Sequence, residues 1–247
     1  MAASLTGSTA LITGATAGIG RAVARQLAER GAEVIVHGRD PERGAAVVSE
    51  IEAAGGRARF LTADLHDADD VRRLAADAGP VDILVNNAGI YRFGTTAETD
   101  DAFFTEQIDV NLRAPFLLVQ ALAPGMVTRG RGTIVNVSTL AATVPARTGG
   151  IYGASKAALE LLTRVWADEF GPAGVRVNAV APGPTYTPGT EDYGPMIEAL
   201  GRTTALGRPA TPDEIASAVT FLASPESAYV NGAILPAAGG VLALSPV

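Results

Sequence analysis

The chain has 247 residues, of which 47% are hydrophobic and 18% charged, and a formal net charge of −7 at pH 7; this suits a single α/β domain over residues 1–247. The acidic balance argues against nucleic acid and anionic membranes as partners. The sequence has no cysteine, no Gly-x-Ser-x-Gly elbow and only two, widely separated histidines, His37 and His66, so it predicts no disulfide, no hydrolase triad and no metal site.

Residues 1–7 lack the basic and long apolar regions of a signal peptide. No apolar run reaches membrane-spanning length without a glycine or a proline. We therefore expect a cytoplasmic protein that has no membrane partner.

The first predicted strand, residues 9–13, runs into a glycine-rich turn and then a helical pattern over 21–30. This order is typical of a dinucleotide site, where glycines let the backbone approach a pyrophosphate and the helix N-terminus offers free N–H groups. Gly14, Gly18 and Gly20 follow the spacing Gly-x-x-x-Gly-x-Gly instead of Gly-x-Gly-x-x-Gly. A turn that serves only close packing is the alternative.

The second predicted strand, residues 33–37, ends at Gly38 and Arg39. Dinucleotide folds often place a carboxylate at this point to bind the ribose 2′-hydroxyl. Here glycine occupies that place, and the guanidinium of Arg39 suits a 2′-phosphate. The sequence therefore favours NADP(H) over NAD(H), with a solvated loop arginine as the alternative.

The rest of the chain continues the alternation of strands and helices. The long helix over 100–128 is expected to be interrupted near Pro115 and Pro124. The pattern predicts a doubly wound parallel sheet of about seven strands with helices on both faces, and a lid over 183–207. The other predicted strands are 58–61, 81–85, 132–137, 175–180 and 233–236, and the other helices are 41–54, 68–77, 191–200, 212–223 and one that begins at Ile151.

Small and polar residues follow several strands. The run Asn86-Asn87-Ala88-Gly89 follows the fourth strand and Ser138 follows the fifth. Such residues suit the ligand crevice of an open sheet, although any turn contains them. Asn111 lies inside the long helix, where asparagine is mildly unfavourable, so it is expected to bond a backbone group or a water.

Tyr152 and Lys156 begin the helix that starts at Ile151 and lie one turn apart. Lowering a phenol pKa from ~10 by about three units takes about 4 kcal/mol, within reach of a desolvated ammonium acting with a cationic cofactor ring. Such a pair could pass a proton to or from a substrate oxygen at neutral pH. The alternative is a core aromatic residue beside a solvated lysine.

The glycine turn, the Asn-Asn-Ala-Gly run, Asn111, Ser138 and Tyr152-x-x-x-Lys156 occur in a fixed order and spacing. In this respect the chain resembles the single-domain branch of the short-chain dehydrogenase/reductase family, including β-ketoacyl-acyl-carrier-protein reductases, from about residue 5 to 240. The resemblance implies a Rossmann-like fold and NADP(H)-dependent hydride exchange with a small-molecule ketone or secondary alcohol. It also suggests a homotetramer, with the apolar faces of helices 100–128 and 150–171 and the tail 241–244 as candidate contacts.

The resemblance further implies a role for each matching residue. Tyr152 would be the general acid/base, and Lys156 would lower its pKa and hold the nicotinamide ribose. Ser138 would hydrogen-bond the substrate oxygen, and Asn111 would anchor a water in a proton relay. The residues expected to contact the cofactor are Gly14, Gly18, Ile19, Gly20, Arg39, Asp64, Leu65, Asn87, Ala88, Gly89, Tyr152, Lys156, Pro182, Gly183, Thr185 and Thr187.

Two positions depart from the family pattern. Ala238 replaces an acidic residue that is common after the last strand, which affects the C-terminal loop and any interface there. Ala17 stands where many NADP-dependent relatives carry a basic residue, so Arg39 is the main phosphate ligand candidate.

Two other functions compete with this reading. A catalytically idle dinucleotide-binding sensor or scaffold would be marked by a damaged tetrad, but Asn111, Ser138, Tyr152 and Lys156 are all present. A sugar epimerase or dehydratase would need a larger C-terminal region than residues 183–247 provide. The fold by itself does not identify the substrate.

Overall fold

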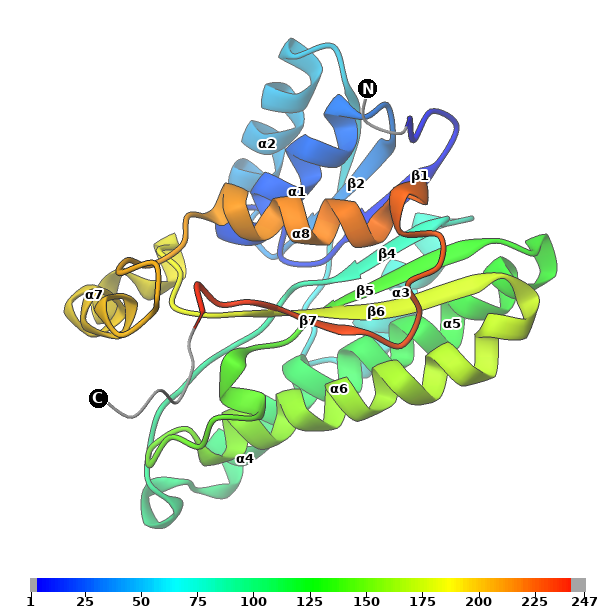
Figure 1. The fold of residues 1–247 in the computed structure, drawn as a ribbon. Coiled ribbons are helices and arrows are strands. Elements are labelled where there is room, and N and C mark those ends of the chain that lie inside the picture. The colour runs from blue at the N-terminus through cyan, green and yellow to red at the C-terminus, as the bar shows by residue number, and fades with distance from the viewer. Residues whose placement is uncertain (1–3, 241–247) are drawn as a thin grey trace.

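The computed structural model describes residues 4–240, so the tail at 241–244 lies outside the described range. Within that range, seven parallel strands form one sheet in the order β3-β2-β1-β4-β5-β6-β7 (Figure 1). The predicted doubly wound parallel sheet is confirmed. The strands are β1 (Thr9–Ile12), β2 (Glu33–Gly38), β3 (Arg57–Thr62), β4 (Ile83–Asn86), β5 (Gly132–Val137), β6 (Val175–Pro182) and β7 (Ile234–Ala237).

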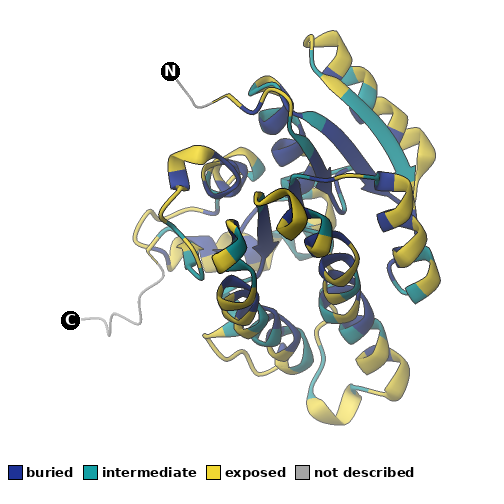
Figure 2. Cartoon of the chain, turned by 90° about the vertical axis from the view of Figure 1, so that its right-hand side faces the viewer, coloured by how far each residue is buried: buried dark blue, intermediate teal, exposed yellow. Residues whose placement is uncertain are grey.

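Helices cover both faces of the sheet. One face carries α1, α2 and α8, and the other carries α3, α5 and α6, each over its own apolar cluster. Figure 2 shows the strands and inner helix faces buried and the outer faces exposed. The helices are α1 (Gly18–Glu29), α2 (Pro41–Ala53), α3 (Ala68–Ala78), α4 (Asp101–Ile108), α5 (Ala114–Arg129), α6 (Gly150–Phe170), α7 (Gly194–Arg202) and α8 (Pro212–Ala223).

The strand order reverses at β1, which pairs with β2 on one side and β4 on the other. The chain therefore leaves β1 and β4 toward opposite faces of the sheet, and a crevice opens beyond their carboxyl ends. The glycine turn, the Asn-Asn-Ala-Gly run and Ser138 all lie at this edge because each follows a parallel strand. The fold thus gathers the predicted site residues at one end of the molecule.

The long helix differs from the prediction. Pro115 falls in the first turn of α5, where a missing N–H costs little, and Pro124 is accommodated inside α5. The irregularity lies instead at Asp109–Arg113, a π-helical turn between α4 and α5 that contains Asn111. The whole segment Asp101–Arg129 is long and apolar enough to cross a membrane, but 56% of its most apolar window is buried in the protein, as in a core helix.

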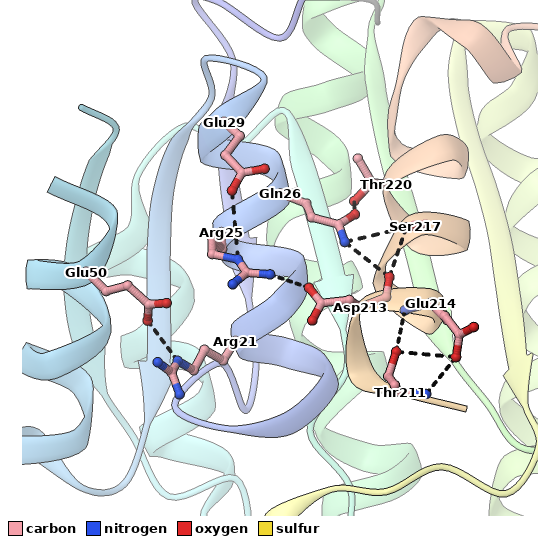
Figure 3. A network of polar contacts seen from close by, with 10 residues as sticks. All are labelled: Arg21, Arg25, Gln26, Glu29, Glu50, Thr211, Asp213, Glu214, Ser217 and Thr220. Carbon is pink, nitrogen blue, oxygen red and sulfur yellow. Dashed lines mark hydrogen bonds and ion pairs between the residues drawn. The ribbon is translucent and has the colours of Figure 1, made fainter. Parts of the chain in front are cut away.

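A polar network links α1 to α8 and α2 (Figure 3). Arg25 pairs with Asp213, and the Gln26 amide donates to the Asp213 carbonyl at 3.1 Å. Arg21 bonds Glu50 of α2 at 2.8 Å. Exposed ion pairs contribute only ~0–1 kcal/mol each, so the apolar contacts between α1 and α8 carry most of the stability. The network mainly holds the register of α1, whose first turn forms part of the site.

His37, the penultimate residue of β2, connects three segments at the crevice. Its Nδ1 accepts the Gly14 N–H at 3.2 Å, and its Nε2 lies 3.2 Å from the Ala63 carbonyl oxygen. These partners require a neutral imidazole with its proton on Nε2. Burial lowers the pKa of His37, the bond to Ala63 opposes this, and the nearby charge of Arg39 adds to the lowering.

We expect this histidine to make stability depend on pH. Because its folded pKa is lowered, the unfolded chain binds the proton first. The stabilisation is complete above the unfolded pKa of ~6.5 and is lost below it, by up to ~1.4 kcal/mol per pH unit until the folded pKa is reached. His37→Asn keeps an acceptor and a donor without titrating, so urea unfolding should show a shallower pH slope for this variant. Equal slopes in the two proteins would contradict the assignment.

Candidate active site

The turn between β1 and α1 packs too closely for side chains. A Cβ on Gly14, which has φ +63°, would lie 2.9 Å from the Ala88 Cα. A Cβ on Gly20 would overlap the Gly14 carbonyl and the Asn87 amide. The two glycines therefore let the turn lie directly against the end of β4.

The N-terminus of α1 is left open. Among the described residues, the N–H groups of Gly18, Ile19 and Gly20 have no hydrogen-bond partner, Ala17 provides no side-chain cap, and the first turn contains no acidic residue. By contrast, Asp40, Asp67 and Thr211 cap α2, α3 and α8. Free N–H groups at the positive end of a helix dipole suit an anion such as a pyrophosphate. This turn therefore fits a dinucleotide.

Thr13, which the sequence analysis did not single out, holds the turn to the run after β4. Its hydroxyl accepts the N–H groups of Asn87 and Ala88, each at 3.0 Å. The Asn87 amide in turn donates to the carbonyls of Thr13 at 2.8 Å and Gly14 at 3.2 Å. Asn87 thus positions the glycine turn, and its amide protons are already committed.

The predicted adenosine end of the site lies beyond β2 and β3. Arg39 is exposed and makes no hydrogen bond or ion pair with any residue in 4–240. Thr16 packs over Gly38, where a Cβ would overlap its methyl group. Leu65 is buried, and the Asp64 carboxylate accepts the His66 N–H at 3.1 Å. The Arg39 guanidinium is therefore free to bind a ligand phosphate.

Lys156 is almost fully buried and donates from Nζ to the Val137 carbonyl at 2.9 Å. Burial lowers the pKa of Lys156 to about 8, so the ammonium remains largely protonated at neutral pH. A Cβ on the exposed Gly89 would lie 3.3 Å from this Nζ. The glycine therefore lets the loop after β4 lie close to the ammonium.

Asn111 uses its side chain to hold the loop after β4. Its Oδ1 accepts the Ile90 N–H and its Nδ2 donates to the Ile90 carbonyl, both at 2.9 Å. Nδ2 also lies 3.3 Å from Gln107 Oε1 and from Ser155 Oγ. The expected bond to a backbone group is present, and the π-helical turn allows Asn111 to reach it.

The hydroxyl next to Tyr152 belongs to Thr139 and not to Ser138. Thr139 interacts with the Tyr152 phenol and lowers its pKa. Ser138 is buried and donates to Glu160 Oε1 at 2.7 Å, and Glu160 is itself only 4% exposed. The Ser138 hydroxyl is thus engaged with Glu160, and its contact with a substrate stays a prediction. In the sequence, this second hydroxyl was visible only as the threonine that follows Ser138.

The surroundings of Tyr152 shift its pKa. Burial raises the pKa of Tyr152, Thr139 opposes that rise, and Tyr91 adds to it. The Lys156 ammonium donates to the Val137 carbonyl and is not among the groups that shift this pKa. The acidic phenol was predicted for the ammonium acting together with a cationic cofactor ring, and it stays a prediction.

The predicted lid begins directly after β6. A Cβ on Gly183 would lie 2.8 Å from the Ala238 Cα, and Thr185 Oγ1 donates to the Gly183 carbonyl at 2.9 Å. A Cβ on Gly18 would lie 3.2 Å from the Thr187 Cβ, so the lid touches the glycine turn. Pro182 is buried as the last residue of β6. The lid residues therefore lie across the crevice from α1.

Comparisons with known proteins agree with this geometry. The profile of a family described as enoyl-(acyl carrier protein) reductase matches residues 14–242. Galactitol 2-dehydrogenase (L-tagatose-forming) of Cereibacter sphaeroides is 40% identical over 96% of this chain and 95% of its own length.

Solved structures are similar over nearly their whole length. One, described as a short chain dehydrogenase/reductase family protein, has a TM-score of 0.91 at 51% identity, covering 96% of this chain and 97% of that chain. A 3-oxoacyl (acyl-carrier-protein) reductase from Agrobacterium tumefaciens C58 with NADP bound has a TM-score of 0.91 at 34% identity, covering 96% and 95%. With the site geometry, these matches confirm what the motifs indicated: the chain belongs to the short-chain dehydrogenase/reductase family of oxidoreductases.

Proposed function

We propose that the protein transfers a hydride between NADP(H) and a small-molecule ketone or secondary alcohol, with residues 1–247 acting as a single cofactor-binding domain. One observation carries the proposal. Tyr152 lies in the first turn of α6, the helix that also holds the buried Lys156, and its phenol interacts with Thr139. This turn lies at the same edge of the sheet as the open N-terminus of α1. A proton donor, a cation and a pyrophosphate site thus share one crevice.

In the proposed mechanism, the nicotinamide cofactor supplies or accepts the hydride when it is bound. Tyr152 gives its proton to the developing alkoxide during reduction and takes it back during oxidation. Thr139 replaces Ser138 as the hydrogen-bond partner of the substrate oxygen. The positive charge of Lys156 favours the phenolate and holds the nicotinamide ribose.

Asn111 is proposed to act mainly by positioning the loop after β4. Its amide already bonds both backbone groups of Ile90. Anchoring a water, as the family resemblance implies, would require the amide to share these bonds. The idle sensor or scaffold has no support, since the similar proteins described above are named as a dehydrogenase and a reductase.

The preference for NADP(H) rests on charge at the end of β2. Gly38 provides no carboxylate that would repel a 2′-phosphate, and Arg39 is unpaired within residues 4–240. The NADP-bound reductase structure from Agrobacterium tumefaciens supports the same choice. The remaining predicted contacts to the cofactor, from Gly14 through Thr187, are part of this proposal.

A cytoplasmic homotetramer is also part of the proposal. Large apolar side chains are exposed on the outer faces of α4, α5 and α6, and such a surface suits subunit contacts. The absence of cysteine is compatible with a reducing compartment. The exposed apolar residues are Phe104, Phe116, Leu161 and Val165, at 49%, 42%, 60% and 48%.

The first test removes the proton donor. Tyr152→Phe keeps the ring and deletes the hydroxyl, so kcat should fall at least ~10²-fold while the NADPH dissociation constant changes only a few-fold. Steady-state kinetics on a reducible ketone and fluorescence titration with NADPH measure the two quantities. Full reductase activity in the variant would make Tyr152 a packing residue.

The second test separates the two adjacent hydroxyls. Thr139→Val should lower kcat about tenfold or more, because a hydrogen bond to the reacting oxygen is lost, while Thr139→Ser should retain activity. Ser138→Ala should instead lower the free energy of unfolding by ~1–3 kcal/mol, since Glu160 loses a buried partner, and leave kcat nearly unchanged. If Ser138→Ala lowered kcat and Thr139→Val left it nearly unchanged, the substrate contact would be assigned to Ser138.

The third test concerns cofactor choice. Charge-assisted hydrogen bonds of about 1.5–3 kcal/mol should favour NADPH over NADH by roughly ten- to hundredfold in kcat/KM. Arg39→Ala should remove most of this preference without changing kcat much. Arg43→Ala, a neighbouring exposed arginine on α2, is the matched control. Equal efficiency with NADH in the wild type would reject the preference.

A further inference from the structure

Two aromatic rings contact the Tyr152 ring, and a third ring packs against both of them. Tyr91 and Phe93, from the loop after β4, lie 6.3 and 6.1 Å from it between ring centroids, at interplanar angles of 71° and 78°. Tyr193, at the end of the 3₁₀ segment Pro188–Tyr193 in the lid, lies 6.3 Å from Tyr91 and 5.5 Å from Phe93. Edge-to-face geometry at these distances is favourable. Ring faces from three separate segments thus meet beside the proposed proton donor.

The four rings are not equally constrained. The Tyr91 hydroxyl interacts with Thr187, and it occupies the space that a side chain at Gly189 would fill. Phe93 is 37% exposed. One wall of the cluster is therefore held against the lid, while the face formed by Phe93 is accessible to a ligand.

Charged side chains of both signs occur on the segments that carry the cluster. Arg92 lies between the two loop aromatics in sequence, but its guanidinium pairs with Glu106 at 2.8 Å and stacks on the Phe103 ring at 4.5 Å. Glu191 and Asp192, which precede Tyr193, are exposed. Arg147 is exposed too and precedes Thr148, whose carbonyl accepts the Gly94 N–H. Charge alone therefore does not decide the substrate class, and the rings do.

We propose that Phe93 and Tyr193, with Tyr91 behind them, form a substrate subsite for a flat apolar group attached to the carbonyl. The preferred substrate is then an aryl or alicyclic ketone, or the matching secondary alcohol. A polyhydroxylated ketone would need a hydrogen-bond partner for each hydroxyl, and the ring faces provide none beyond the phenol groups of Tyr91 and Tyr193. This inference rests on the proposed oxidoreductase function and adds the substrate class.

The test compares ketones of different chemistry with NADPH as the donor. Wild-type kcat/KM should be at least about tenfold higher for acetophenone and cyclohexyl methyl ketone than for erythrulose and for 2-oxobutanoate. Phe93→Ala and Tyr193→Ala should each raise KM for acetophenone by roughly tenfold, with kcat and the NADPH KM nearly unchanged. Tyr193→Phe keeps the ring and should retain the preference.

A binding measurement supports the kinetics without turnover. Calorimetric titration of 1-phenylethanol into the enzyme with NADPH, a dead-end complex, should show about tenfold weaker binding in the two alanine variants. Tyr229→Ala is the control, because Tyr229 is fully exposed and precedes β7, at the opposite edge of the sheet.

The outcomes separate the two proposals. A higher kcat/KM for erythrulose or 2-oxobutanoate, or an equal loss on every ketone in the alanine variants, would overturn the subsite while leaving the oxidoreductase function in place. If no ketone is reduced and 1-phenylethanol does not bind, the subsite and the proposed function both fail.

Discussion

The site depends on how closely the first turn of α1 approaches the carboxyl ends of β1 and β4. The Asn87 amide bonds the carbonyls of Thr13 and Gly14, and Gly20 leaves room for both. A methyl group at either glycine would separate the turn from β4. Because α1 starts there without a side-chain cap, its free N–H groups face the crevice. Apolar contacts between α1 and α8 carry most of the stability of this arrangement.

Buried polar groups beneath the crevice restrict movement of the catalytic side chains. Lys156 is held by the Val137 carbonyl, and Asn111 is tied to Ile90. A buried amide ladder runs deeper, with Asn86 donating to Asn136 at 2.8 Å. The Asn86 Oδ1 has no partner among the described residues, at a cost in free energy. Moving one of these side chains would break a buried hydrogen bond that water would not replace, so each bond restricts movement of its side chain.

Most elements and most cofactor-facing residues could be predicted because they depend on local patterns. Apolar runs followed by glycine marked the strands, and helical periodicity marked the helices. In the long helix the irregularity is the π-helical turn just before Pro115, whereas Pro124 is accommodated inside α5. The position of the Lys156 ammonium could not be predicted, because spacing along a helix does not reveal which carbonyl an ammonium will bond.

The sequence by itself determined the strand–helix alternation, the glycine turn and the Tyr152-x-x-x-Lys156 pair, since each is a periodic or local feature. Only the tertiary structure distinguished the surroundings of Ser138 and Thr139. Successive residues at the end of a strand point to opposite faces, and the register that orients them comes from pairing with β6, where the Ser138 N–H donates to Val180. The aromatic cluster likewise required the tertiary fold, because its rings come from segments about forty to a hundred residues apart, and no local pattern links such segments.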